Sequence, residues 1–284
     1  MGWTLVVFLS HAMDSNETSS PSRQIAKAVQ RVLDEGGIAA LATLMAQPGN
    51  SGAKILVEAA GARTGTLGDE RLDSAVTEFA KRFLAARDAA RTFSIIEFAP
   101  QLNEWAEANI LFERIEPEPH IVICGAGHVG AALAQLAALL GYRTTLIDDR
   151  AEFVTRERFP QETIALVAAI NWTEAVRAAI GNGRGVSVAV VTRGHNEDEE
   201  CMHAVIGTKP DYIGLIGSKR RTNIVLDRLR QVGADEEQLR QVHAPVGLDI
   251  GAVTPEEVAL AILSEIVLER RGGKGSSLSA WRRT

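Results

Sequence analysis

The feature that most restricts the fold of this chain is a glycine-rich turn between an apolar strand and a helix. Residues 120–150 read HIVICGAGHVGAALAQLAALLGYRTTLIDDR. A strand, the turn GAGHVG, a helix and a second strand follow one another, which is the pattern that opens a dinucleotide-binding fold. We therefore expect a parallel sheet with crossover helices in this part of the chain.

Each glycine of the turn has its own expected role. Gly125 permits the tight turn, Gly127 lets a phosphate approach the backbone, and Gly130 lets helix and strand pack closely. Free backbone N–H groups and the helix dipole favour an anion there. Asp148, 18 residues beyond Gly130, ends the second strand, where an acid that binds a ribose is expected. The turn predicts a site for a phosphate-bearing ligand; the alternative is that the glycines serve packing alone.

The identity of the nucleotide stays open. Asp149 and Arg150 follow Asp148, and Arg150 is suited either to the 2′-phosphate of NADP or to solvent. His128 places a titratable donor beside the expected anion. It is either a ligand contact or simply a residue at the helix start.

Strands and helices alternate after residue 120. We expect strands at 120–124, 144–148, near 164, 186–192 and 212–216, with helices at 128–140, 172–180, 197–206 and 218–232. A last helix begins at Thr254, where TPEE forms a capping box with proline in the first turn, and runs to about residue 270. Continuous apolar strands that alternate with helices predict a Rossmann-like, doubly wound parallel sheet.

The residues before the linker EPEPH (116–120) have the pattern of a separate mixed α/β domain. Helices are expected at 21–35 and 69–87, and strands at 38–45, 54–58, near 65, 91–100 and 108–115. The expected organisation is a disordered leader at 1–20, an α/β domain at 21–115, the Rossmann-like domain at 120–271 and a flexible tail at 272–284.

Three more loops follow strand ends and should share an edge with the glycine turn, because open parallel sheets bind ligands beyond the carboxyl ends of their strands. The first holds Arg193, Gly194 and His195. His195 is the one candidate catalytic residue, as a general acid or base; it also suits a ligand contact, a metal ligand or a plain turn. We expect no metal, because Cys201 points away from the face that Glu199 and His203 share, and residues 198–200 have the character of a solvated face.

The second loop brings positive charge to the same edge. Gly217 and Ser218 make the turn, and Lys219 and Arg220 follow it, which suits a phosphate or another anion, or a solvated helix start. The third loop contains Pro245, Gly247 and Asp249 directly before the capped last helix, and we expect it to border the same pocket.

Composition excludes several other classes. The net charge is −6 with no dense Lys/Arg tract, so nucleic acid is not an expected partner. The two cysteines, Cys124 and Cys201, form no CxxC pair, so neither a disulfide framework nor a thiolate zinc site is indicated. The apolar run 3–9 is too short to span a bilayer. These features are typical of a cytoplasmic protein without a membrane partner.

The four loops together resemble those of the XdhC/CoxI type of xanthine dehydrogenase accessory proteins. The resemblance covers roughly residues 120–270 and extends to IAALATLM, GAKILV and GTLG in the first domain. The chain departs from the family after Gly68, where Asp69, Glu70 and Arg71 replace a turn that usually ends in cysteine. The motifs are Gly125–Gly130 with Asp148–Arg150, Arg193–His195, Ile216–Arg220 and Pro245–Gly251 before Thr254–Glu257.

This resemblance implies a cofactor-binding maturation factor rather than an enzyme. Such proteins hold the molybdenum cofactor, a molybdopterin, assist its sulfuration with a cysteine desulfurase, and deliver it to an apo molybdenum hydroxylase of the xanthine dehydrogenase type. A homodimer is also expected, since the first domain has apolar strands to cover. The alternatives are an NAD- or NADP-dependent oxidoreductase with His195 as the proton-transfer residue, or a dinucleotide-binding regulatory module.

Overall fold

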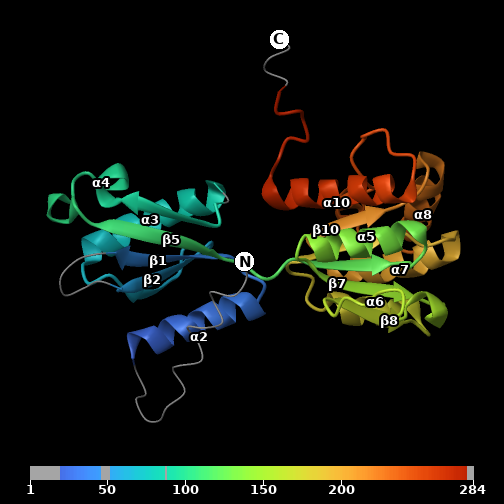
Figure 1. Cartoon of the computed structure of the whole chain (residues 1–284), viewed down its shortest axis with the longest axis horizontal. Coiled ribbons are helices and arrows are strands. Elements are labelled where there is room, and N and C mark those ends of the chain that lie inside the picture. The colour runs from blue at the N-terminus through green and yellow to red at the C-terminus, as the bar shows by residue number, and fades with distance from the viewer. Residues whose placement is uncertain (1–19, 46–51, 87, 280–284) are drawn as a thin grey trace. The chain divides into compact units, whose positions relative to one another are not determined.

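The computed structural model describes residues 20–45, 52–86 and 88–279 (Figure 1). The chain divides between Pro117 and Glu118 into two compact units. Apart from Ser20, the expected leader lies outside the described residues, as does most of the turn at 47–52. The expected tail is described as far as residue 279 and contains no helix or strand there beyond the end of the last helix at Arg271.

The first unit contains a five-stranded antiparallel sheet in the order β3-β2-β1-β5-β4. Its strands are β1 (Ala39–Met45), β2 (Lys54–Glu58), β3 (Arg63–Thr66), β4 (Ala90–Ser94) and β5 (Asn109–Ile115). Alternate residues face opposite sides, as the two-residue period of a strand requires. Ala40, Ala42 and Leu44 of β1 join one core, whereas Ala39 and Leu41 join the other.

Helices of the same unit cover both faces of this sheet. They are α2 (Pro21–Asp34), α3 (Glu70–Ala86), α4 (Ile95–Phe98) and the short 3-10 helix η1 (Asn103–Trp105). Helix α2 packs Ile25, Ala28 and Val32 into one core, and α3 packs Val76 and Phe83 into the other. The unit's own helices therefore cover the apolar strands that suggested a homodimer, and the homodimer itself stays a prediction.

The strand predicted at 91–100 is wrong beyond Ser94. There the chain turns into α4, and the side chain of Glu97 accepts a hydrogen bond from the Ser94 N–H at 2.8 Å. This is a capping box, which satisfies backbone N–H groups at the start of a helix and so favours α4 over a longer strand here. Ile95, the first residue of α4, is completely buried.

The second unit contains a six-stranded sheet in the order β11-β10-β9-β6-β7-β8. Every neighbouring pair is parallel. The strands are β6 (His120–Cys124), β7 (Arg143–Asp148), β8 (Ile164–Ala168), β9 (Val186–Val190), β10 (Tyr212–Leu215) and β11 (Val242–His243). The predicted fold class is confirmed: an antiparallel sheet with helices, followed by a Rossmann domain.

Helices lie on both faces of the parallel sheet (Figure 1). Leu133 of α5 and Ile262 of α10 belong to one core cluster, whereas Val176 of α6 and Val205 of α7 belong to the other. Among the described residues, no helix is both long and apolar enough to cross a membrane. The helices are α5 (His128–Leu139), α6 (Trp172–Ile180), α7 (His195–Thr208), α8 (Lys219–Gln231), α9 (Glu236–Arg240) and α10 (Pro255–Arg271), with the 3-10 helix η2 (Ala151–Phe153).

Three details differ from the sequence prediction. Strand β9 ends at Val190 rather than at 192, and α7 begins at His195 rather than at 197. The sequence does not predict helix α9 and strand β11, since elements of five and two residues are too short to show a period. Strand β11 nevertheless extends the sheet, because it pairs with Ile213 and Gly214 of β10.

Candidate functional site

Backbone hydrogen bonds hold the predicted loops in a row beyond the carboxyl ends of the strands. The bonds run from Gly125 N to Ile147 O, from Val191 N to Cys124 O, from Ile216 N to Val190 O and from Val246 N to Leu215 O, at 2.7 to 3.0 Å. The turns after β6, β9, β10 and β11 therefore line one edge. The chain reverses its direction of growth between β6 and β9, which is where ligands bind in open α/β sheets.

The three glycines of the turn after β6 have different surroundings. A Cβ on Gly125 would lie 2.6 Å from Val191 O, and Gly125 has φ +113°. A Cβ on Gly130 would lie 1.8 Å from Gly125 O. A Cβ on Gly127 would meet no atom within 4 Å, and its φ is −66°. Packing therefore requires glycine at 125 and 130, but the space at Gly127 is left open to a ligand.

Helix α5 begins at that open position. Gly127 is its N-cap and has no side chain to receive a hydrogen bond from the first turn. The first N–H groups of a helix have no partner within the helix, and they carry the positive end of its dipole. His128, the first helical residue, is exposed. The geometry at Gly127 suits an anion such as a phosphate.

Asp148, at the end of β7, is bound to the glycine turn. Its carboxylate accepts hydrogen bonds from Ala126 N at 2.7 Å and from Arg150 through the backbone N, Nε and Nη2 at 2.8 to 3.0 Å. Burial raises the pKa of Asp148, but the guanidinium of Arg150 and the two backbone N–H groups outweigh it and lower the pKa to about 2. Asp148 is therefore ionised and fixes the turn.

A second ion pair joins the loop after β7 to the loop after β9. Both nitrogens at the end of Arg193 bind the carboxylate of Asp149, at 2.8 and 2.7 Å, and Arg193 also lies 3.2 Å from Glu197. Gly194 is the N-cap of α7, and the exposed His195 is its first residue. The predicted Arg-Gly-His turn therefore lies next to the predicted acidic residues.

Asp198 does not belong to a solvated face, contrary to the sequence prediction. Its side chain has no solvent exposure. It accepts a hydrogen bond from Thr192 Oγ1 at 2.6 Å and forms an ion pair with Arg221, whose Nε lies at 3.0 Å. Burial raises the pKa of Asp198, and the bonds from Thr192 and Arg221 oppose this effect. Asp198 therefore ties the loop after β9 to α8.

The loop after β10 presents cations at the same edge. Gly217 has φ +145°, which favours glycine, and Ser218 caps α8 by accepting a hydrogen bond from Arg221 N at 3.3 Å. Lys219 and Arg220 are exposed in the first turn of α8. Positive side chains at a helix start oppose the dipole, so an anion bound nearby would stabilise this arrangement.

The loop after β11 is anchored on α10. Gly247 donates a hydrogen bond from its N–H to Glu265 Oε2 at 2.9 Å, and the Tyr212 hydroxyl donates to the same oxygen at 2.6 Å. Gly247 has φ +107°, and a Cβ there would lie 3.3 Å from Ala261. Pro245 and Asp249, on either side of Gly247, are exposed.

Arg158 lies beside the glycine turn, and the sequence does not predict it as a site residue. Its Nη1 donates to Phe153 O at 2.6 Å, and its Nη2 lies 3.4 Å from Ala126 O. It is exposed and adds a positive charge next to Gly127. Because Arg158 follows η2 in an irregular segment, no periodicity or turn signal marks it.

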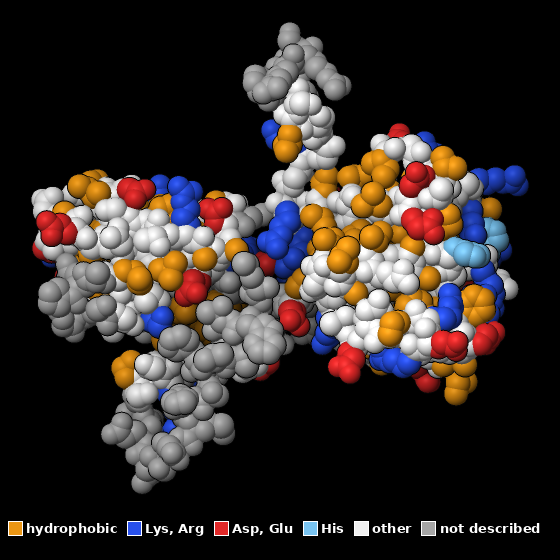
Figure 2. All heavy atoms as spheres, in the orientation of Figure 1, with side chains coloured by type: hydrophobic (Ala, Val, Ile, Leu, Met, Phe, Trp, Pro, Cys, Tyr) orange, Lys and Arg blue, Asp and Glu red, His pale blue; other side chains and the backbone are white. Residues whose placement is uncertain are grey.

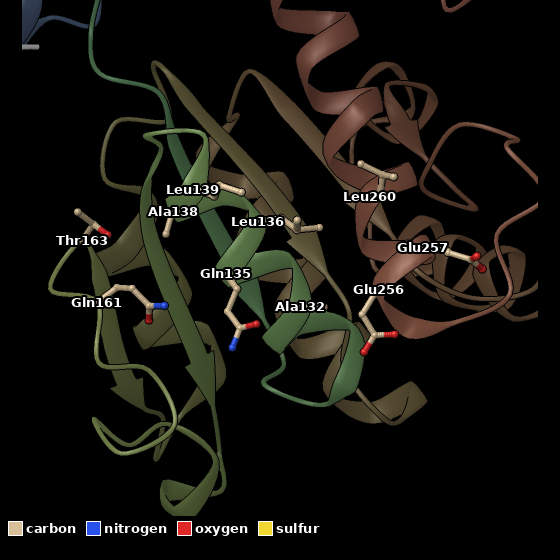
Figure 3. Close-up of a pocket in the computed structure, with 10 residues that line it drawn as sticks. All are labelled: Ala132, Gln135, Leu136, Ala138, Leu139, Gln161, Thr163, Glu256, Glu257 and Leu260. Carbon is tan, nitrogen blue, oxygen red and sulfur yellow. The ribbon is translucent and has the colours of Figure 1, made fainter. Parts of the chain in front are cut away.

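Charged side chains gather at one end of the second unit. The arrowhead of β7 points to the right in Figure 1, and in the same orientation Figure 2 shows Lys, Arg, His and acidic side chains at that end of the unit. A groove of about 650 Å³ lies elsewhere, between α5, α10 and residues 161–163 (Figure 3). It contains Leu139, Leu260, Glu256 and Glu257 and no cation, so it does not suit an anionic ligand.

The two cysteines are distant in sequence but belong to one core. Cys124 ends β6 and Cys201 lies in α7; both are fully buried and free. Burial, and then the neighbouring thiol of Cys124, raise the pKa of Cys201 far above its ordinary value. Within the part of the chain that the structure describes, no three His, Cys, Asp or Glu side chains are grouped closely enough to hold a metal ion.

Comparisons with known proteins give the class of this chain. Residues 121–266 match the family described as the XdhC Rossmann domain, and residues 32–95 match the XdhC and CoxI family. The chain belongs to the XdhC/CoxI family, and the resemblance that its loops indicate is confirmed.

Three relatives are similar in sequence. YqeB of Escherichia coli, an uncharacterised protein, is 37% identical over 55% of the chain and 28% of its own length. A Bacillus subtilis protein named as a probable xanthine dehydrogenase component is 29% identical over 65% of the chain and 52% of its length. The molybdenum cofactor insertion chaperone PaoD of E. coli is 25% identical over 54% of the chain and 41% of its length. The chain thus spans about half or less of each relative.

A crystal structure named as a xanthine dehydrogenase from Bacillus halodurans is also similar. Its TM-score is 0.62 and its sequence identity 20%, over 89% of this chain and 68% of the other. At this identity the similarity supports the fold of the chain and nothing more.

Proposed function

We propose that this chain is a molybdenum cofactor-binding accessory protein that assists sulfuration of the cofactor and its insertion into a xanthine dehydrogenase-type hydroxylase. The observation that carries the proposal is the open space at Gly127. The protein itself does not need glycine there, yet the residue stands at the start of α5, beside cationic loops. The relative named as a cofactor insertion chaperone supports the identity of the ligand.

The residues present fit a phosphate-bearing pterin. The backbone N–H groups of the first turn of α5, at His128, Val129 and Gly130, would hold the phosphate, because the N-cap Gly127 has no side chain to accept their hydrogen bonds. Lys219 and Arg220 would supply further positive charge, and His195 would donate a hydrogen bond to the polar pterin. When bound, the cofactor supplies the oxygen- and sulfur-bearing molybdenum that a hydroxylase needs.

Sulfur would have to come from a partner, for which we propose a cysteine desulfurase. Cys124 and Cys201 are buried in the core, so neither thiol reaches a bound ligand. Where relatives usually have a turn ending in cysteine, Asp69 caps α3 instead, accepting hydrogen bonds from Arg71 N and Leu72 N at 2.8 and 3.1 Å. This chain would hold and present the cofactor without a thiol of its own.

Native mass spectrometry under anaerobic conditions tests the proposal. Purified protein is offered isolated molybdenum cofactor, and retention is compared between the wild type, Gly127→Ala and Gly207→Ala. Gly207 is exposed near the end of α7, and a Cβ there has 4.0 Å to its nearest neighbour, so it controls for the added methyl group. We expect retention by the wild type and Gly207→Ala, and loss in Gly127→Ala. Absence of retention in the wild type would refute the proposal.

A further inference from the structure

We infer that the pair Asp148–Arg150 closes the ribose position of this fold, so that the glycine turn accepts a ligand ending in a phosphate monoester and rejects dinucleotides. The inference rests on the proposed function of the same turn. It gives these two residues a role in selecting the ligand. It also distinguishes a site for the molybdenum cofactor from a site for NAD or NADP, which the sequence leaves open.

In a dinucleotide-binding fold, the acid at the end of the second strand accepts hydrogen bonds from the ribose hydroxyls. Asp148 occupies that place, at the end of β7. An ionised carboxylate offers about four lone-pair sites. Four donors fill them here: Oδ1 accepts from the backbone N and Nε of Arg150, and Oδ2 accepts from Arg150 Nη2 and Ala126 N. No acceptor site of Asp148 is left for a ribose.

The guanidinium of Arg150 is held in this place from several sides. It lies over the ring of Phe153, with 3.6 Å from its central carbon to the ring centroid. The side chain of Asp148 is only 2% exposed, whereas that of Arg150 is 29% exposed and covers it. Because the pKa of Asp148 is about 2, the carboxylate stays ionised at neutral pH and the pair persists. A ribose would have to displace a charged, stacked side chain.

The same arrangement disfavours the 2′-phosphate of NADP. Arginine recognises phosphate through its paired N–H groups. Nε and Nη2 of Arg150 already bind Asp148. Arg193, in the neighbouring loop, is likewise paired with the carboxylate of Asp149, so both arginines already bind an acid in place of a phosphate. A pterin whose phosphate has not been extended by a nucleotide needs no ribose position, so it avoids the conflict.

Isothermal titration of the full-length protein with NAD and with NADP tests the inference. For the wild type we expect dissociation constants weaker than about 1 mM. Arg150→Ala frees Asp148 and should strengthen NAD binding by about tenfold or more, because a hydrogen bond to a charged carboxylate contributes strongly. Arg150→Gln should do the same in a milder form. Arg184→Ala removes the same charge from the exposed turn before β9, at the other end of the strands, and should change nothing.

Adding Gly127→Ala to Arg150→Ala should abolish the gain in NAD affinity. That result would show that the dinucleotide binds at the glycine turn. Micromolar binding of NAD or NADP to the wild type would overturn the inference. So would the absence of a gain in both Arg150 variants once circular dichroism shows that they are folded. Retention of the molybdenum cofactor by the wild type is a separate result: its loss would refute the proposed function, whatever the dinucleotides do.

Discussion

At the scale of single residues, the glycine turn meets two requirements: close packing of the backbone and space for a ligand. The sequence motif alone does not show which glycine serves which requirement. Gly125 and Gly130 are glycines because backbone atoms lie 2.6 and 1.8 Å from where a Cβ would be. Gly127 has no such neighbour. The sequence gives each of the three glycines a role, and the structure shows that packing restricts Gly125 and Gly130 and leaves Gly127 free. That distinction gives the first prediction.

Gly127→Ala should leave the free energy of unfolding within about 1 kcal/mol of the wild type, since only a helix N-cap changes. Gly130→Ala should destabilise the protein by about 3 kcal/mol or more, because its methyl group would overlap Gly125 O. Urea unfolding measures both. If Gly127→Ala were the more destabilising of the two, our division of the turn into a packing part and a ligand part would be wrong.

His120 should make the fold sensitive to acid. Its Nδ1 faces Nη2 of Arg143 at 3.0 Å and must accept, so Nε2–H donates to Thr145 Oγ1 at 2.9 Å. Burial, and then the charge of Arg143, lower the pKa of His120 to about 4. The unfolded chain therefore binds the proton more readily, and stability is lost as the pH falls from about 6.5 to 4.

The loss amounts to about 3 kcal/mol for a pKa shift of this size. Unfolding free energies measured across this range in wild type and His120→Gln test it, and the dependence should largely disappear in the variant. A further loss between about pH 4 and 2 belongs to Asp148, whose pKa is lowered instead. An unchanged slope above pH 4 in His120→Gln would contradict the assignment.

At the scale of helices and strands, a capping signal in the sequence predicts a helix reliably where a helical pattern of apolar residues follows it. The sequence predicts Thr254 as the cap of α10, and its Oγ1 accepts from Glu257 N at 3.2 Å. The same signal at Ser94 is hard to recognise because α4 has only four residues and follows a strand. The solvated face predicted at 198–200 is wrong for Asp198, because sequence cannot show that α8 places Arg221 opposite it.

The link between α7 and α8 yields a prediction at this scale. Asp198→Ala should destabilise the protein by about 2 to 3 kcal/mol, because it leaves Thr192 and Arg221 without their buried acceptor. Asp198→Asn should cost less, since burial already disfavours the charged form. Glu199→Ala removes a solvent-exposed partner of Arg228 and should cost at most about 0.5 kcal/mol. Equal losses in Asp198→Ala and Glu199→Ala would contradict this account.

At the scale of the whole molecule, loops that are far apart in the sequence lie side by side along one edge of the parallel sheet. The sequence predicts the parallel sheet from its alternating apolar strands, and with it the shared edge. It cannot predict which side chains neutralise one another there. Asp148 binds Arg150 and Asp149 binds Arg193, whereas Lys219 and Arg220 are exposed at the same edge.

The core also defines what the two thiols can do. Because burial raises the pKa of Cys201 and Cys124 is completely buried, neither should react with a thiol reagent at pH 8 in the folded protein. Both should react after unfolding in urea. Labelling followed by mass spectrometry checks this. Rapid modification of either cysteine in the native protein would contradict this prediction and would mean that this chain can offer a reactive thiol to a bound ligand.

The central claim is that the glycine-turn edge holds a cofactor for delivery, and transfer tests it most directly. An apo molybdenum hydroxylase of the xanthine dehydrogenase type is incubated anaerobically with isolated molybdenum cofactor, a cysteine desulfurase and this protein, and the recovered activity is measured. We expect that wild type and Gly207→Ala increase the active fraction and that Gly127→Ala does not. Equal activation by Gly127→Ala, or the same activation without the protein, would contradict it.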